Sequence, residues 1–223
     1  MVHLLATNNP GKAAEVKPMF EAAGMTLITL ADLGLYFEAA EDGDTFVHNA
    51  AQKAMETVDF LKGAGGHSPP LHIGDYPYRK YLNPFDIAVL ADDSGLVIDA
   101  LDGEPGVDSA LYLGRDTPYP VKCQSLVDRL AHVPEDKRTA RFVCTLVCVY
   151  PDGRTIMAEG TIEGRIAHEM HGEGGFGYDP IFYYPPYGKT MAQLSKDEKN
   201  GISHRGQAIQ KMIGLMINED SCI

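Results

Sequence analysis

Residues 3–30, HLLATNNPGKAAEVKPMFEAAGMTLITL, carry the clearest periodic pattern in the chain. The apolar run His3–Ala6 predicts a short buried strand, and Thr26–Leu30 predicts a second one. Between them Gly24 is expected to end a helix, whereas Pro18 should kink that helix or shorten its regular part. The helix is predicted because apolar residues recur at the spacing of one helical face, at Val16, Met19, Phe20 and Ala23.

Outside this unit, predicted helices and strands continue to alternate without internal repeats. This order predicts an α/β fold with a mixed central sheet flanked by helices. The expected hairpin turns at Pro151-Asp-Gly-Arg154, and a capping-box pattern, Ser195-x-x-Glu198, precedes the last helix. Helices are predicted at 45–61, 123–130 and 209–216, and strands at 87–91, 142–150, 155–159 and 161–167.

Residues 62–84 separate the second predicted helix from the strand at 87–91. They are rich in Gly, Pro, Tyr and His and have no sustained periodicity. A connection of this length inside an α/β unit is usually functional or mobile. We therefore expect one domain of two lobes over residues 1–223, carrying an inserted loop at 62–84.

The net charge of −12, from 19 basic and 31 acidic residues, excludes several classes of partner. A negative field of this size repels nucleic-acid polymers and anionic membrane surfaces. No apolar run approaches the ~20 residues that cross a bilayer, and the first residues lack the pattern of a secretion signal. The expected location is the cytoplasm, where the four cysteines, which form no C-x-x-C pair, are expected to be buried reduced thiols.

The charge is also unevenly distributed along the chain. Residues 92–108 hold six carboxylates and no basic residue, whereas residues 189–211 hold five basic residues against two acidic ones. A small polyanion that binds together with a metal ion would use both kinds of segment.

The first chemical motif is a polar turn between the first strand and the first helix, Thr7-Asn8-Asn9-Pro10-Gly11-Lys12. Backbone N–H groups and the positive end of the helix dipole converge at such a turn, which favours phosphate binding. The turn is not a Walker A loop, because the second glycine and the Lys-Ser/Thr pair are missing. The alternative is a strand-to-helix turn with an exposed lysine.

The second motif, Asp92-Asp93-Ser94-Gly95, follows the predicted strand at 87–91, where open α/β sheets bind their ligands. Successive carboxylates point to opposite faces, so one of the two aspartates is expected in the site. With the acidic turn at Glu41-Asp42, the sequence offers the oxygen ligands that Mg²⁺ uses when it also binds substrate phosphates. The alternative is an acidic turn without function.

The third and fourth motifs lie in the C-terminal half of the chain. In Gly172–Pro180, four glycines permit close backbone approach, and the rings of Phe176 and Tyr178 could stack on a planar base. A glycine-rich turn with core aromatics is the alternative. Residues 195–206, SKDEKNGISHRG, place basic side chains in the locally basic segment, and the alternative for them is a solvated helix and turn.

Taken together and in this order, the four motifs resemble those of the inosine triphosphate pyrophosphatase family. The resemblance runs from Leu5 to about Ile209 and is carried by ADDSGL, GGFGYDPIF and ISHRGQA. It implies an elongated α/β fold with a nucleotide cleft between two lobes, dependence on Mg²⁺ and a homodimer. The implied reaction is hydrolysis of non-canonical purine nucleoside triphosphates (ITP, dITP, XTP) to the monophosphate and pyrophosphate.

Carried over position by position, the resemblance implies that Asp93 is catalytic, as the proton acceptor for the attacking water. Glu41 and Asp93 would bind the metal, and Ser94 would contact the substrate. Lys199 would meet phosphate or base-proximal oxygens. The triphosphate would be held by Thr7, Asn8, Asn9, Pro10, Gly11 and Lys12, and the purine by Phe176, Gly177, Tyr178, Asp179, His204 and Arg205.

The chain departs from the family pattern at several positions. Asn8 stands where relatives carry glycine, which a positive φ would accommodate because asparagine adopts that conformation more easily than most residues. Ala40-Glu41 stands where two glutamates are usual, so Glu38 or Asp42 is an alternative metal ligand. His48 replaces a glutamate. Two rival functions remain, a nucleotide-binding protein without turnover and a pyrophosphatase of different base preference.

Overall fold

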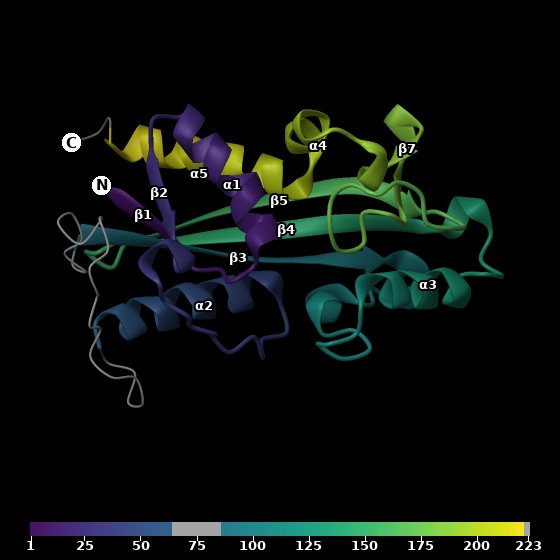
Figure 1. Cartoon of the computed structure of the whole chain (residues 1–223), viewed down its shortest axis with the longest axis horizontal. Coiled ribbons are helices and arrows are strands. Elements are labelled where there is room, and N and C mark those ends of the chain that lie inside the picture. The colour runs from purple at the N-terminus through teal and green to yellow at the C-terminus, as the bar shows by residue number, and fades with distance from the viewer. Residues whose placement is uncertain (64–85, 221–223) are drawn as a thin grey trace. The chain divides into compact units, whose positions relative to one another are not determined.

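The computed structural model describes residues 1–63 and 86–220. Within them the strands form one seven-stranded sheet in the order β2-β1-β3-β4-β5-β6-β7 (Figure 1). β1 is parallel to β2 and to β3, and β6 is antiparallel to β5 and to β7, so the sheet is mixed, as predicted. The strands are β1 (Val2–Leu5), β2 (Thr26–Thr29), β3 (Ile87–Ile98), β4 (Thr139–Val149), β5 (Thr155–Ile166), β6 (Phe182–Tyr184) and β7 (Lys189–Thr190).

The chain divides into two compact units, and three strands contribute residues to both. Unit 1 comprises Met1–Asp93, Thr145–Glu159 and Ala208–Ile223, and unit 2 comprises Ser94–Cys144 and Gly160–Gln207. The boundaries fall inside these strands, β3, β4 and β5, and inside the last helix. The α-helices are α1 (Pro10–Ala22), α2 (Phe46–Leu61), α3 (Tyr119–Arg129), α4 (Lys196–Ile202) and α5 (His204–Asp220).

In unit 1, helices cover both faces of the strands (Figure 1). α1 and α5 lie on one face of β1 and β3, and α2 lies on the other. Alternate residues of β3, Ile87, Val89 and Ala91, pack in one apolar cluster with Ala50 and Ala54 of α2. Because successive strand residues point to opposite faces, the next residues of β3 are directed alternately toward α1 and toward α2.

The first helix follows its predicted pattern with one exception. Val16 and Phe20 are fully buried, and Gly24 has a φ of +72°, the left-handed conformation expected of the residue that ends a helix. Pro18 neither ends nor shortens the helix, which is continuous from Pro10 to Ala22. Residue 18 is exposed, so its ring lies on the solvent side of the helix.

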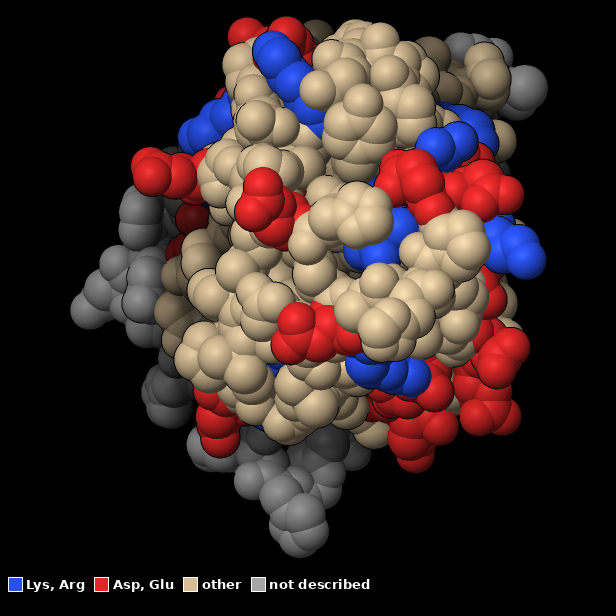
Figure 2. All heavy atoms as spheres, turned by 90° about the vertical axis from the view of Figure 1, so that its right-hand side faces the viewer, with Lys and Arg blue, Asp and Glu red and all other residues tan. Residues whose placement is uncertain are grey.

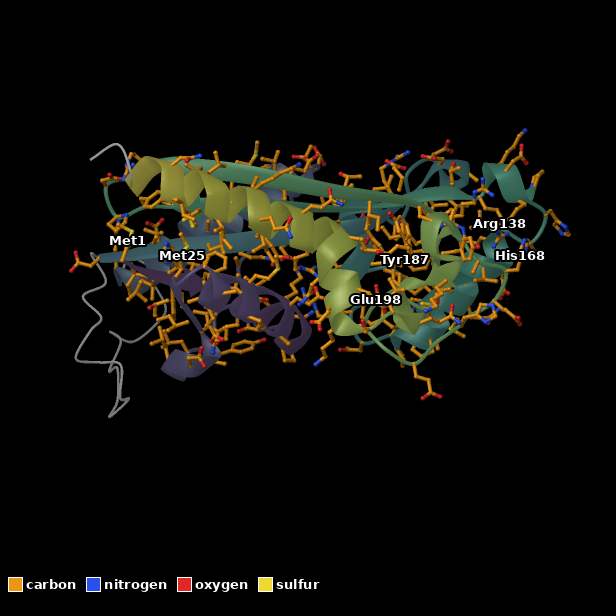
Figure 3. The ribbon with its side chains drawn as sticks, turned by 90° about the horizontal axis from the view of Figure 1, so that it is seen from above. Met1, Met25, Arg138, His168, Tyr187 and Glu198 are labelled. Carbon is orange, nitrogen blue, oxygen red and sulfur yellow. The ribbon has the colours of Figure 1, made fainter. Side chains whose placement is uncertain are left out.

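In unit 2, α3 packs its predicted apolar face on the strands. Cys123, Leu126, Val127 and Leu130 belong to one buried cluster with residues of β3, β4 and β5. Arg138, labelled in Figure 3, is completely buried beside this cluster. Its guanidinium donates to the carbonyl oxygens of Leu130, Ile166 and Ala167 at 2.5, 2.8 and 2.8 Å, so that it satisfies backbone acceptors from two segments.

Two predicted boundaries were wrong. β3 runs for 12 residues rather than ending at 91, and the strands predicted at 155–159 and 161–167 form the single strand β5. The predicted capping box of Ser195 and Glu198 is confirmed, and it begins the short helix α4, which precedes the last helix. The predicted hairpin between β4 and β5 is confirmed by the 2.8 Å bond from Tyr150 N to Arg154 O.

The surface mixes both signs of charge, and the described cysteines are buried. On the face shown in Figure 2, basic side chains lie as separate groups beside acidic ones. Cys123, Cys144 and Cys148 are buried and form no disulfide, as predicted, whereas Cys222 lies outside the described residues. No helix in the described part of the chain has the length and apolar character needed to cross a membrane. The predicted insertion at 62–84 lies, after residue 63, outside the described residues.

Candidate functional site

The predicted phosphate turn leads into α1, and side chains of the turn itself accept hydrogen bonds from its backbone N–H groups. Asn9 caps the helix, because its Oδ1 accepts from Gly11 N at 2.9 Å and from Lys12 N at 3.2 Å. Thr7 Oγ1 accepts from Asn9 N at 3.1 Å, and Pro10, at the first helical position, has no N–H. Asn9 therefore already holds the first two backbone donors of the helix.

Asn8 does not have the positive φ that was expected at a position where relatives carry glycine. The only described residues other than glycine with a positive φ are Asp102 and Leu113. The side-chain amide of Asn8 instead donates to Phe37 O at 2.8 Å. Phe37 in turn stacks on Phe60 of α2, with ring centroids 4.6 Å apart. Asn8 thus joins the phosphate turn to the segment that leads to Glu41.

The two adjacent aspartates lie inside β3 and not in a turn after it. The expectation that they point to opposite faces agrees with their partners. Asp92 pairs with Lys12 of α1, with Nζ 2.9 Å from Oδ2, whereas Asp93 accepts from Asn49 Nδ2 of α2 at 3.0 Å. Both carboxylates are buried, at 0% and 6% exposure. The alternative interpretation of this motif as an acidic turn is wrong, because both aspartates lie in a strand.

The pKa of Asp93 is raised above its ordinary value. Burial is the main cause, and the negative charge of Glu41 acts in the same direction. The hydrogen bond from Asn49 and the charges of Lys12 and Lys53 oppose this rise without cancelling it. A carboxylate with a raised pKa is a better proton acceptor than an ordinary one, so Asp93 has the electrostatics of a general base.

Lys53 is a further residue of this cluster, and the sequence analysis missed it. It forms an ion pair with Glu41 and donates to Asp92 O at 3.2 Å. Burial disfavours its charge, but Asp92, Glu41 and Asp93 outweigh burial, so that its pKa is raised and it stays protonated. The sequence pattern could have indicated this residue. Polar residues recur every four positions on the inward side of α2, at Asn49, Lys53 and Thr57, and polar residues on a buried helix face suggest a site.

A divalent metal fits the donor set of unit 1. No group of three or more His, Cys, Asp or Glu residues able to hold a metal is found in residues 1–63 and 86–220. The carboxylates of Glu41 and Asp93 do interact electrostatically across the site. Mg²⁺ commonly binds through one or two carboxylates together with substrate phosphates, so two carboxylates are a sufficient protein contribution.

In unit 2, Asp179 is the centre of a second cluster. Its Oδ2 accepts from Phe176 N at 2.8 Å and from Lys199 Nζ at 2.7 Å, in an ion pair whose side chains are 4% and 7% exposed. A Cβ on Gly175, whose φ is +71°, would lie 2.1 Å from the same oxygen. The backbone of the glycine turn therefore packs directly against the Asp179 carboxylate. The predicted residues Asp179, Phe176 and Lys199 are in contact.

The ring of Phe176 lies close to two cationic groups. Lys199 Nζ is 4.7 Å and Arg205 Cζ is 5.4 Å from its centroid. Arg205 also donates to Ser94 Oγ at 3.1 Å, which joins the first residue of unit 2 to the start of α5. His204 stacks on Phe142 of β4 at 4.8 Å. Phe176, Ser94 and Arg205 thus form one connected group.

Tyr178 belongs to the core and not to an open face. It is 4% exposed, its hydroxyl donates to Ser109 O at 2.8 Å, and burial raises its pKa. Tyr119 lies edge-on to its ring, with centroids 5.3 Å apart. Of the two aromatic rings in this motif, Phe176 is the more accessible.

Comparison with known proteins gives consistent matches over nearly the whole chain. The model of the Ham1 family matches residues 3–215. A dITP/XTP pyrophosphatase of Desulforamulus reducens is 39% identical over 213 residues, which cover 96% of this chain and 94% of that protein. One of Exiguobacterium sibiricum is 41% identical over 209 residues, covering 94% and 93%.

Solved structures agree with these matches. A Ham1 protein of Staphylococcus aureus is 36% identical, with a TM-score of 0.78 and coverage of 98% of this chain and 100% of that one. A HAM1 protein of Coxiella burnetii is 31% identical, with a TM-score of 0.78 and coverage of 98% and 99%.

Proposed function

Because the chain belongs to the Ham1 family, we propose that it hydrolyses non-canonical purine nucleoside triphosphates, namely ITP, dITP and XTP, to the monophosphate and pyrophosphate. Its curated relatives are named dITP/XTP pyrophosphatases. The observation that carries the proposal is the cluster of unit 1, in which Asp93, with a raised pKa, lies among Glu41, Lys12 and Lys53. Such a cluster can bind a polyanion and also accept a proton.

The triphosphate would be bound by positive charge near the phosphate turn. Lys12 and Lys53 are point charges that already pair with carboxylates, so phosphate oxygens would compete for cations that are in place. The turn from Thr7 to Lys12 would contribute backbone and side-chain donors. Because Asn9 holds the N–H groups of Gly11 and Lys12, a phosphate that used those donors would have to displace its side chain.

Glu41 and Asp93 are the residues that would hold Mg²⁺, with phosphate oxygens completing its coordination. When bound, the ion would neutralise charge on the triphosphate. Asp93 would orient a water molecule and take its proton as the water oxygen forms a bond to the α-phosphorus. The bond between the α-phosphorus and the bridging oxygen breaks, and pyrophosphate leaves with that electron pair.

The purine would be recognised by the cluster of unit 2, formed by Phe176, Gly177, Asp179, His204 and Arg205, with the buried Tyr178 supporting this cluster from the core. Phe176 offers a ring for stacking. Arg205 has N–H donors and no acceptor, which suits the carbonyl oxygens of hypoxanthine and xanthine. Adenine carries an amino group at position 6, so a donor would face a donor, at a cost of ~1–3 kcal/mol for each buried group left unsatisfied. Lys199 would support this pocket from its pair with Asp179.

The family resemblance and the negative charge of the chain support the remaining proposals. We propose that the protein is a homodimer in the cytoplasm, that it is one domain of two lobes with an insertion at 62–84, and that it binds no nucleic-acid polymer. Light scattering on the purified protein tests the homodimer. A monomer at micromolar concentration would contradict it.

The direct test of function is release of pyrophosphate from dITP, ITP and XTP, compared with dATP and GTP, with Mg²⁺ and with EDTA. We expect release from the first three only, and only with the metal. Binding of dITP without turnover would favour a nucleotide-binding protein. Comparable rates with all five nucleotides would favour a pyrophosphatase of different base preference.

A further inference from the structure

Asn49 is a buried polar residue whose side chain contacts two parts of the site in unit 1. It lies on the inward face of α2 and is 2% exposed. Its Nδ2 donates to Asp93 Oδ2 at 3.0 Å, and its Oδ1 accepts from Gly43 N at 2.8 Å. One side chain therefore joins the strand residue proposed as the base to the segment that carries Glu41.

The backbone at Gly43 lies against this amide. A Cβ at residue 43 would lie 2.8 Å from Asn49 Oδ1 and 2.6 Å from the ring of His48, so a larger residue would have to displace both side chains. Gly43 is two residues after Glu41, in a segment without helix or strand. The position of the Glu41 segment over α2 thus depends on a contact that only glycine permits here.

The orientation of the Asn49 amide follows from its neighbours. The backbone N–H of Gly43 can only donate, so the oxygen of the amide must face it. The NH₂ group then faces the carboxylate of Asp93, which accepts. Aspartate at this position would lack the donor, alanine would lack both groups, and only an amide of this length provides a donor and an acceptor in this geometry.

We propose that Asn49 is a positioning residue that orients the Asp93 carboxylate and holds the Glu41 segment in place for metal binding and attack by water. The inference rests on the proposed function, because it assigns Asp93 and Glu41 to those tasks. Outer partners of catalytic and metal-binding side chains fix the orientation of those side chains, and their loss typically costs ~10–100-fold in activity or metal affinity.

The test compares Asn49→Asp and Asn49→Ala with wild type in steady-state hydrolysis of dITP and in Mg²⁺ titration. Asn49→Asp keeps the shape and an oxygen for Gly43 N–H, and Asn49→Ala introduces no buried charge. We expect kcat to fall ~10–100-fold in each variant. Calorimetric titration of Mg²⁺ into protein saturated with dIMP, the monophosphate product, should show weaker metal binding in both variants. The affinity of the uncharged variant Asn49→Ala for dITP, measured in EDTA, should be unchanged.

The matched control is Thr57→Val, which removes a buried hydroxyl from the same face of α2 without a contact to Asp93 or Gly43. It should lower the thermal unfolding temperature and leave kcat and metal affinity unchanged. If the Asn49 variants kept wild-type kcat and metal affinity, or lost no more than Thr57→Val, the inference would be overturned. If wild type itself released no pyrophosphate, the failure would lie in the proposed function.

Discussion

Lys12 Nζ lies 2.9 Å from Asp92 Oδ2, so the first of two adjacent aspartates is neutralised by the lysine of the phosphate turn. The second, Asp93, has a neutral amide as its hydrogen-bond donor instead. Their different partners on opposite faces of β3 divide the motif into an ion-paired residue and a residue with a raised pKa. This division explains why Asp93 is the better candidate for the base.

Asp93→Asn should reduce kcat for dITP by ~10²–10⁴-fold, the usual worth of a general base. The substitution also removes a charged oxygen from the proposed metal site, without a change of volume. Steady-state pyrophosphate release measures the effect, with Asp92→Asn as the comparison. If Asp92→Asn abolished turnover while Asp93→Asn kept it, the assignment within the pair would be wrong.

The same variant should be more stable than wild type at neutral pH. The folded state raises the pKa of Asp93 above its ordinary value, so it disfavours the charged carboxylate that the unfolded chain carries at neutral pH. This penalty is present above the folded pKa and is absent below the unfolded pKa. Thermal unfolding from pH 7 to pH 3 should therefore show an advantage for Asp93→Asn that disappears in acid. A constant advantage across this range would mean that the titration of Asp93 is not its cause.

Lys53→Met should weaken binding of dITP more than binding of dIMP, because a lysine that meets phosphate contributes more as the phosphate charge grows. It also leaves Glu41 without its ion-pair partner. Calorimetry in EDTA measures both affinities. Lys62→Ala is the control, since that lysine is exposed just after the same helix. Equal losses for the two nucleotides would show that Lys53 does not contact the phosphate chain.

Arg205→Ala should lower kcat/KM for dITP more than for dATP, so that the ratio between them falls. The reason is the loss of donors that match a carbonyl oxygen at position 6 of the base. A substrate panel measures the ratio, with Ser94→Ala as a second variant that removes the partner of Arg205 and keeps the guanidinium. An unchanged ratio in Arg205→Ala would assign Arg205 to the phosphates or to structure.

Lys199→Met should destabilise the protein by about 3–5 kcal/mol, the cost typical of leaving one member of a buried ion pair uncompensated. Asp179 would lose its cation while remaining 3% exposed. Urea unfolding measures the change, and the double variant Asp179→Asn/Lys199→Met should recover part of the loss. No difference between the single and double variants would mean that the pair is not coupled.

The sequence predicted those elements whose pattern is local. The first strand–helix–strand unit and α2 were predicted within one or two residues, because apolar spacing and the residues at their ends were sufficient. β3 was predicted too short, since two adjacent aspartates favour a turn when their partners are unknown. Lys12 and Asn49, which are distant in sequence, make it possible for the strand to continue through them.

The sequence was sufficient to predict which residues belong to the site, but it predicted only some of the contacts between them. The family resemblance assigned Phe176, Asp179 and Lys199 to the substrate site, and in the structure these three residues are in contact. It did not predict Lys53, because a lysine in a helix is usually solvated, nor the use of Asn8 to bind Phe37 O. Those contacts depend on which side chains meet after folding, which a single sequence does not reveal.

Arg138 limits how this chain can change over evolutionary time. Its guanidinium serves three carbonyl groups from two segments at a fully buried position. Lysine offers one nitrogen and glutamine one amide, so a single mutation would leave carbonyl groups without donors inside the fold. A substitution at residue 138 would therefore be tolerated only together with changes in the neighbours that supply these carbonyl groups. We therefore expect arginine at this position even in distant relatives whose catalytic preferences have diverged.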